Sequence, residues 1–147
     1  MRRLTFIGIG CGFGLALIMA FGNAPAAAQE PQELMSSRAM QVAGSNNFDQ
    51  YCVTCHGKDG KGKGPLASSL NPKPADLTGI ALRNGGTYPA QMVFDVIDGA
   101  KKVKGHGGGD MPEWGDAFGK SAHTDGMDGA KKRIETLVAF LETIQTK

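Results

Sequence analysis

The feature that most constrains this chain is the pentapeptide Cys52-Val53-Thr54-Cys55-His56, which lies in the stretch QYCVTCHGKDGKGKG. Two thiols stand three residues apart, and an imidazole directly follows the second thiol. A disulfide at this spacing would close too small a loop to stabilise a fold, so the motif indicates a local chemical use.

Three common uses of such a motif fit the surrounding sequence poorly. A structural zinc site needs four ligands, but the other histidines, His106 and His123, have no partner cysteine. A thioredoxin-like dithiol needs hydrophobic strands around the motif, whereas the flanks read AGSNNFDQY and GKDGKGKGP. A phosphate-binding loop needs Ser or Thr after its lysine and a strand before it, and this stretch has neither.

Covalent attachment of haem gives each Cys and His of the motif a chemical role. Two thiols three residues apart can add to the two vinyl groups on one edge of a porphyrin, and the following histidine then lies beneath the iron. We therefore predict one haem c, attached by two thioethers to Cys52 and Cys55, with His56 as an iron ligand. The chain has a single motif of this kind, so no relay between haems is expected within it.

The N-terminal segment has the pattern of a secretory signal peptide. Arg2 and Arg3 precede an apolar, uncharged run from Leu4 to Phe21, and the small-residue stretch NAPAAAQE follows. We predict cleavage after Ala28, which leaves residues 29–147 as one mature domain in the periplasm. An uncleaved signal would instead be a marginal membrane anchor, because the apolar run has only 18 residues.

Loss of the signal changes the charge of the protein. The full chain has 16 basic and 14 acidic residues, and the predicted signal removes two arginines and no acid. The mature chain is then formally neutral, which argues against a nucleic-acid-binding function. Its lysines are nevertheless grouped, and two clusters are candidates for steering an acidic redox partner: Lys58, Lys61 and Lys63, and Lys101, Lys102 and Lys104.

Methionine is the usual second axial ligand of an electron-transfer haem, and three candidates follow the motif. Met92 belongs to the apolar stripe of a predicted helix, where core packing explains it better, and Met127 lies in a polar turn. Met111 lies in GHGGGDMPEWG, where glycines let the backbone pass close to a flat cofactor and Pro112 stiffens the exit. We predict Met111 as the ligand, with His106 as the alternative.

The periodicity of the mature chain predicts helices near Gln32–Ala43, Ala90–Ile97 and Lys131–Gln145, with a short helix or turn after Met111. Long Gly- and Pro-rich loops connect them. The last helix has one apolar face, formed by Ile134, Leu137, Val138, Leu141 and Ile144 and flanked by Phe140. The expected wall residues of a cofactor site are Leu66, Leu77, Tyr88 and Trp114.

The spacing Gly44-x-x-x-Phe48-x-x-x-Cys-x-x-Cys-His, with Met111-Pro112 and an amphipathic C-terminal helix, resembles the class I (monohaem) c-type cytochromes. The resemblance covers the chain from about Ala39 to its end. It implies an all-α cytochrome c fold, in which the N- and C-terminal helices cross at Gly44 and long loops enclose the haem.

The resemblance also implies that a proline carbonyl binds the second ring nitrogen of His56. Pro65 is the first candidate, and Pro72 and Pro74 are the alternatives. Such a bond would fix the orientation of the imidazole ring.

These observations predict a periplasmic carrier of single electrons that is not an enzyme. Its haem would be ligated by His56 and Met111, and its partners would be a redox donor and acceptor, such as a dehydrogenase or a terminal oxidase. The acids beside the methionine, Asp110 and Glu113, are expected to be solvated. Two alternatives stay open: a haem with an open or labile sixth site for ligand binding, sensing or catalysis, and a cytochrome subunit of a dehydrogenase or oxidase complex.

Overall fold

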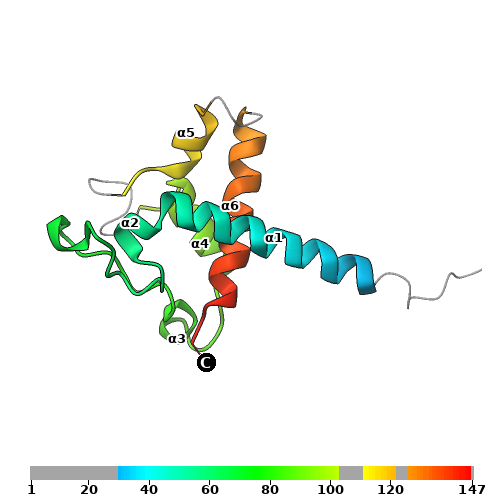
Figure 1. Cartoon of the computed structure of the whole chain (residues 1–147), viewed down its shortest axis with the longest axis horizontal. Helices are drawn as coiled ribbons and strands as arrows, with labels where there is room; N and C mark the ends of the chain where they lie inside the picture. Colours follow the sequence, from blue (N-terminus) through cyan, green and yellow to red (C-terminus); the bar gives the residue numbers. More distant parts are fainter. Residues whose placement is uncertain (1–29, 103–110, 122–125, 147) are drawn as a thin grey trace, which may run out of the picture.

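The computed structural model describes residues 30–102, 111–121 and 126–146, which form helices and loops without a β-strand (Figure 1). The predicted all-α class is therefore confirmed. The helices are α1 (Glu30–Tyr51), α2 (Val53–His56), α3 (Ile80–Arg83), α4 (Ala90–Asp98), α5 (Trp114–Gly119) and α6 (Gly126–Thr143), with a 3₁₀ turn η2 (Ala67–Ser69). None of the described helices is both long and apolar enough to cross a membrane.

Several sequence predictions concern residues outside these ranges. They are the signal peptide, residues 1–28, and the side chains His106, Lys104, Asp110 and His123.

Helix α6 forms the centre of the molecule and packs against α1, α4 and α5. Its predicted apolar face is confirmed, since Ile134, Leu137 and Leu141 are at most 4% exposed. Phe48 of α1 and Phe118 of α5 complete this core. The core therefore joins the N-terminal helix to the C-terminal helix, and the remaining elements are arranged around that pair.

The predicted crossing of α1 and α6 at Gly44 is also confirmed (Figure 1). A Cβ atom at this position would lie 1.9 Å from the carbonyl oxygen of Thr136 and 2.7 Å from Cβ of Phe140. Beside the crossing, Asn47 Nδ2 donates to Thr136 Oγ1 at 3.0 Å. The ring of Phe48 packs against that of Phe140 with centroids 5.3 Å apart. Only a residue without a side chain allows this approach.

Helix α1 is longer than the sequence predicted. The predicted helix ends near Ala43, and the next four residues, GSNN, are weak helix formers. The helix instead continues to Tyr51, since contacts with α6 outweigh the local preference. Its N-terminal part extends beyond the other helices (Figure 1), where Leu34 and Met35 are exposed.

The predicted helix near Ala90–Ile97 is α4, which follows Pro89, ends at Asp98 and is capped by Gly99. Gly99 has a φ of 99°, and its N–H donates to the carbonyl of Asp95 at 3.2 Å, so it closes the helix as a left-handed cap. The short helix expected after Met111 is α5. Helix α6 begins at Gly126, earlier than the predicted Lys131.

Candidate cofactor-binding site

The junction of α1 and α2 places the pentapeptide motif. Cys52 lies between the two helices, and its N–H donates to the carbonyl of Phe48 at 2.9 Å. The N–H of His56 in turn donates to the carbonyl of Cys52 at 2.9 Å. Because Phe48 is buried in the core, these bonds fix the motif relative to the crossing of α1 and α6. Both Cys52 and Cys55 are free thiols.

The Gly/Lys-rich stretch after the motif folds back along α2. Its amides satisfy the carbonyls at the end of that helix: Gly62 N donates to His56 at 2.8 Å, and Gly64 N donates to Cys55 at 3.1 Å. A Cβ atom at Gly64 would lie 2.5 Å from the carbonyl oxygen of Thr54. The glycines are therefore explained by close backbone approach, which is a different use from binding phosphate.

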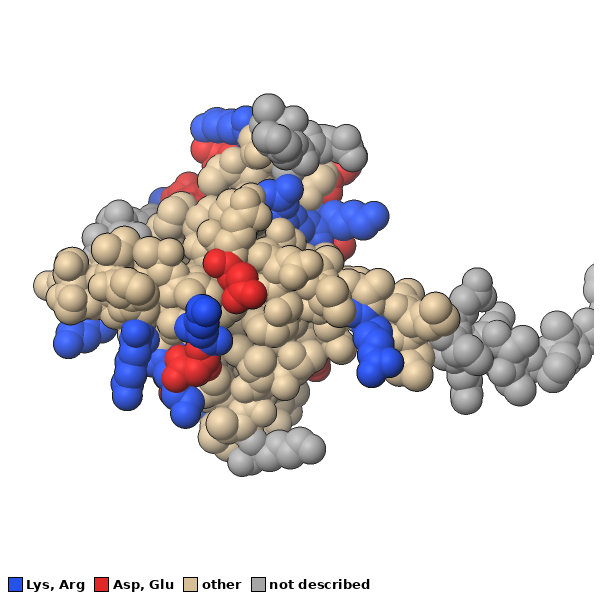
Figure 2. Space-filling model, viewed as in Figure 1, with Lys and Arg blue, Asp and Glu red and all other residues tan. Residues whose placement is uncertain are grey.

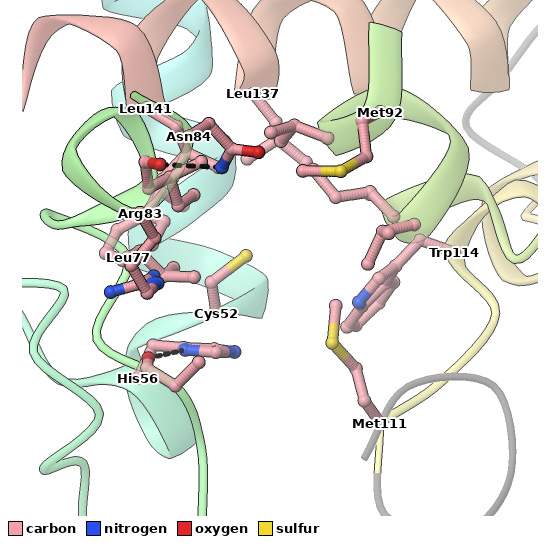
Figure 3. Close-up of a pocket in the computed structure, with 16 residues that line it drawn as sticks. Cys52, His56, Leu77, Arg83, Asn84, Met92, Met111, Trp114, Leu137 and Leu141 are labelled. Atoms are coloured by element: carbon pink, nitrogen blue, oxygen red, sulfur yellow. Dashed lines mark hydrogen bonds between the residues drawn. The ribbon is translucent and has the colours of Figure 1, made fainter. Parts of the chain in front are cut away.

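A largely apolar cavity lies beside the motif, enclosed by residues of α1, α2, α3, α4 and α6 and by the segment around Met111 (Figure 3). Its polar lining residues are His56, Arg83 and Asn84, together with the indole of Trp114. Leu77 and Leu137 are among its apolar walls. No carboxylate lines the described part of this cavity.

His56 points its ring into the cavity and is only 6% exposed (Figure 3). Its Nδ1 lies 3.1 Å from the carbonyl oxygen of Ala75. Because a carbonyl can only accept, Nδ1 carries the proton and Nε2 keeps its lone pair. Burial lowers the pKa of His56, and the bond to Ala75 opposes that shift in part. The ring is therefore held neutral, which is the form that binds metals.

The identity of this carbonyl corrects the prediction. The partner of His56 is Ala75 rather than Pro65, Pro72 or Pro74. The oxygen belongs to the residue that follows Pro74 in the chain, so the expected kind of bond is present, but a different residue supplies the accepting carbonyl. The path of the loop between α2 and α3 decides which carbonyl reaches the ring.

Met111 lines the cavity on the side opposite His56 (Figure 3). The fold thus brings an imidazole from α2 and a thioether from the segment before α5 to facing walls. Met92 of α4 also lines this cavity. Met127 is 66% exposed in α6 and does not belong to the site.

The two cysteines differ in position. Cys52 lines the cavity, whereas Cys55 lies half-buried on α2 and is not among the lining residues. Burial, together with the nearby Cys55, raises the pKa of the Cys52 thiol to about 12. Cys52 is therefore a neutral thiol at physiological pH and presents sulfur to the apolar space.

Trp114 supplies a polar atom that sequence reasoning missed. Its Nε1 is buried and has no hydrogen-bond partner in the part of the chain that the structure describes, and it faces the cavity (Figure 3). The ring is held by Phe118 and Tyr51, with centroids 5.0 Å and 5.5 Å away. An unsatisfied buried donor costs about 1–3 kcal/mol, which an acceptor on a bound ligand would offset.

The other expected wall residues divide into two groups. Leu77 and Trp114 line the cavity as predicted. Leu66 is 49% exposed and does not line the cavity. Tyr88 is not among the lining residues either, and its hydroxyl donates to the carbonyl of Val138 at 3.1 Å. Glu113, expected to be solvated, forms an exposed ion pair with Lys102 at 3.2 Å.

The arrangement can hold a flat, mainly apolar ligand between a nitrogen donor and a sulfur donor. Among the described residues, no group of three or more His, Cys, Asp or Glu side chains is placed to hold a metal ion. Comparison with known proteins finds no matching protein family, no matching curated protein and no matching solved structure. The interpretation of the site therefore rests on its own residues.

Proposed function

We propose that this protein binds one haem c covalently and transfers single electrons in the manner of a class I c-type cytochrome. One observation carries the proposal: His56 and Met111 occupy facing walls of an apolar cavity, and the thiol of Cys52 lies in the same cavity. A histidine and a methionine are the axial ligands of a haem that carries electrons.

The residues present fit this cofactor. Cys52 and Cys55 would hold it by two thioethers, and His56 and Met111 would ligate its iron. When bound, haem supplies a one-electron ferric/ferrous couple. The described lining offers apolar walls to the macrocycle and donors, Arg83 and the buried N–H of Trp114, to its polar groups.

The chain itself controls the environment of the couple. Ala75 orients the imidazole of His56 and makes its metal-facing nitrogen more basic. Apolar side chains such as Leu77 and Leu137 form much of the cavity wall. Both a methionine thioether and an apolar surrounding favour the less charged, reduced state and so raise the reduction potential.

The protein is further proposed to work in the periplasm with a redox donor and acceptor, such as a dehydrogenase or a terminal oxidase. The predicted signal peptide supports export. Exposed Lys58, Lys61 and Lys63 lie on the loop that follows α2, and Figure 2 shows basic side chains gathered over this lower left part of the molecule. A partner with an acidic surface fits this distribution.

The test is production of the full chain in a bacterial host that exports proteins and attaches haem c. The purified protein should be heavier by one haem, and its alkaline pyridine spectrum should be that of a haem with two thioethers. Cys52→Ser should shift this spectrum to that of a single thioether. Cys11→Ser, within the predicted signal, is the matched control and should leave the mature protein unchanged.

Two outcomes would overturn parts of the proposal. A wild-type chain that takes up no haem would refute the cofactor. A haem protein that is high-spin, and that binds carbon monoxide readily when reduced, would favour the alternative with an open sixth site.

A further inference from the structure

The four residues 75–78, called here the histidine strap, form a short segment that runs from the ligand side of the cavity towards α3. Each of their four successive carbonyls accepts a hydrogen bond from a different residue. The carbonyl of Ala75 accepts from His56 Nδ1 at 3.1 Å, and that of Asp76 accepts from Arg83 Nη2 at 2.6 Å. The carbonyl of Leu77 accepts from Gln145 Nε2 at 2.9 Å. The carbonyl of Thr78 accepts from Thr146 twice, from N at 2.8 Å and from Oγ1 at 3.0 Å.

The strap is thus fixed by the loop after α2 and by the residues that follow α6. Its Leu77 N–H donates to the carbonyl of Gly60 at 2.7 Å, in the loop that covers α2. Its Leu77 and Thr78 carbonyls are held by Gln145 and Thr146, which follow α6. Figure 1 shows the C-terminal end of the chain beside α3.

Gln145 connects the strap to two other elements. Its Oε1 accepts from the N–H of Ala81 at 2.9 Å, and its Nε2 donates to Leu77 and to Leu141, at 2.9 Å and 2.7 Å. The amide therefore uses both of its N–H donors and its oxygen. It joins the end of α6, the first turn of α3 and the strap at one point.

We propose that Gln145 is a positioning residue for His56, which acts through the strap on the hydrogen bond between His56 Nδ1 and Ala75. This inference rests on the proposed function, because it assigns Gln145 a part in tuning the axial ligand of the haem. A firmly held carbonyl strengthens the Nδ1–H bond and makes the imidazole a stronger donor to a metal. A released strap weakens that bond, which disfavours the ferric state and raises the reduction potential.

The first experiment compares haem-loaded wild type with Gln145→Glu. The substitution keeps an acceptor for Ala81 and removes both N–H donations, one of which holds the strap. We expect an upward shift of the midpoint potential and several-fold faster solvent exchange of the His56 Nδ1 proton in the NMR spectrum. A lower melting temperature with unchanged potential and exchange would show a purely structural role and overturn the proposal.

A second pair of variants decides the matter if Gln145→Glu does not fold. Thr146→Val removes the hydroxyl bond to the strap, whereas Thr143→Val removes an equivalent hydroxyl bond to the carbonyl of Phe140 at 2.7 Å within α6. We expect Thr146→Val to shift potential and exchange in the same direction, by a smaller amount, and Thr143→Val to shift neither. Equal effects of the two valines would contradict the inference.

Failure of the proposed function is distinguishable from failure of this inference. A wild-type chain that binds no haem refutes the function, and proton exchange at His56 Nδ1 then remains the readout for the variants. A wild-type chain that binds haem, with a potential that is insensitive to Gln145 and Thr146, refutes the inference alone.

Discussion

Gly44 lies directly against the backbone of Thr136, so that a Cβ atom on Gly44 would be 1.9 Å from the Thr136 carbonyl oxygen. This contact sets the distance between α1 and α6. Because α1 leads through Phe48 and Cys52 into α2, the same contact also positions the histidine of the site.

Gly44→Ala should destabilise the protein by about 2 kcal/mol or more, because the added methyl group forces the two helices apart. Denaturant unfolding would measure the loss. The sign is informative, since alanine in place of glycine in an exposed helix stabilises by about 1 kcal/mol. Asn46→Ala, at an exposed position of the same helix, is the control and should be neutral or slightly stabilising. A stabilised Gly44→Ala variant would contradict the close crossing.

Asp76 contributes stability that depends on pH. Its carboxylate accepts from Thr78 Oγ1 at 2.7 Å and Thr78 N at 2.8 Å. The side-chain bond from Thr78 is the main cause that lowers the pKa of Asp76. A lowered pKa means that the stabilisation is complete above the ordinary Asp pKa of about 3.9 and is lost as the pH falls through the folded-state value.

Asp76→Asn should therefore lower the melting temperature at neutral pH, and the difference from wild type should shrink in acid. Melting curves between about pH 3 and pH 7 would measure this. Thr78→Val removes the hydroxyl that donates to Asp76. In a Thr78→Val background, Asp76→Asn should therefore cause a smaller pH-dependent change in melting temperature. A destabilisation by Asp76→Asn that stays constant over this range would show that the carboxylate charge is unimportant.

The lysines after the motif should accelerate electron transfer from the haem-loaded protein to anionic oxidants. Lys58, Lys61 and Lys63 are exposed on the loop beside the site, so changing all three to Gln should slow oxidation by ferricyanide about threefold or more at low salt. Stopped-flow measurements should show that the difference disappears at about 0.5 M salt, where charges are screened. Changing Lys131 and Lys132 of α6 to Gln is the control. Equal slowing by the control pair would argue for net charge instead of a local surface.

The parts of the fold that could be predicted from the sequence depend on local patterns. The apolar face of α6 repeats with helical spacing, and Leu137 and Leu141 are buried as that spacing requires. The spacing Gly44-x-x-x-Phe48 marks the glycine at which the helices are expected to cross, and α1 and α6 do cross at Gly44.

The structure differs from the sequence predictions where contacts between residues far apart in the chain decide the conformation. The residues after Ala43 are weak helix formers, yet Asn47 bonds to Thr136 and the helix continues. The carbonyl that holds His56 depends on the path of a long loop, which is set by contacts such as Leu77 with Gly60. The sequence offered no local signal for either contact, nor for the unpaired indole N–H of Trp114.

Ligation by Met111 is tested most directly by the optical spectrum of the haem-loaded protein in two variants of the same cavity, Met111→Ala and Met92→Ala. We expect wild type and Met92→Ala to keep the weak far-red band of a sulfur–iron bond in the ferric state and to resist carbon monoxide in the ferrous state. Met111→Ala should lose the band and bind carbon monoxide. Loss of the band in Met92→Ala, with its retention in Met111→Ala, would contradict the assignment of the ligand.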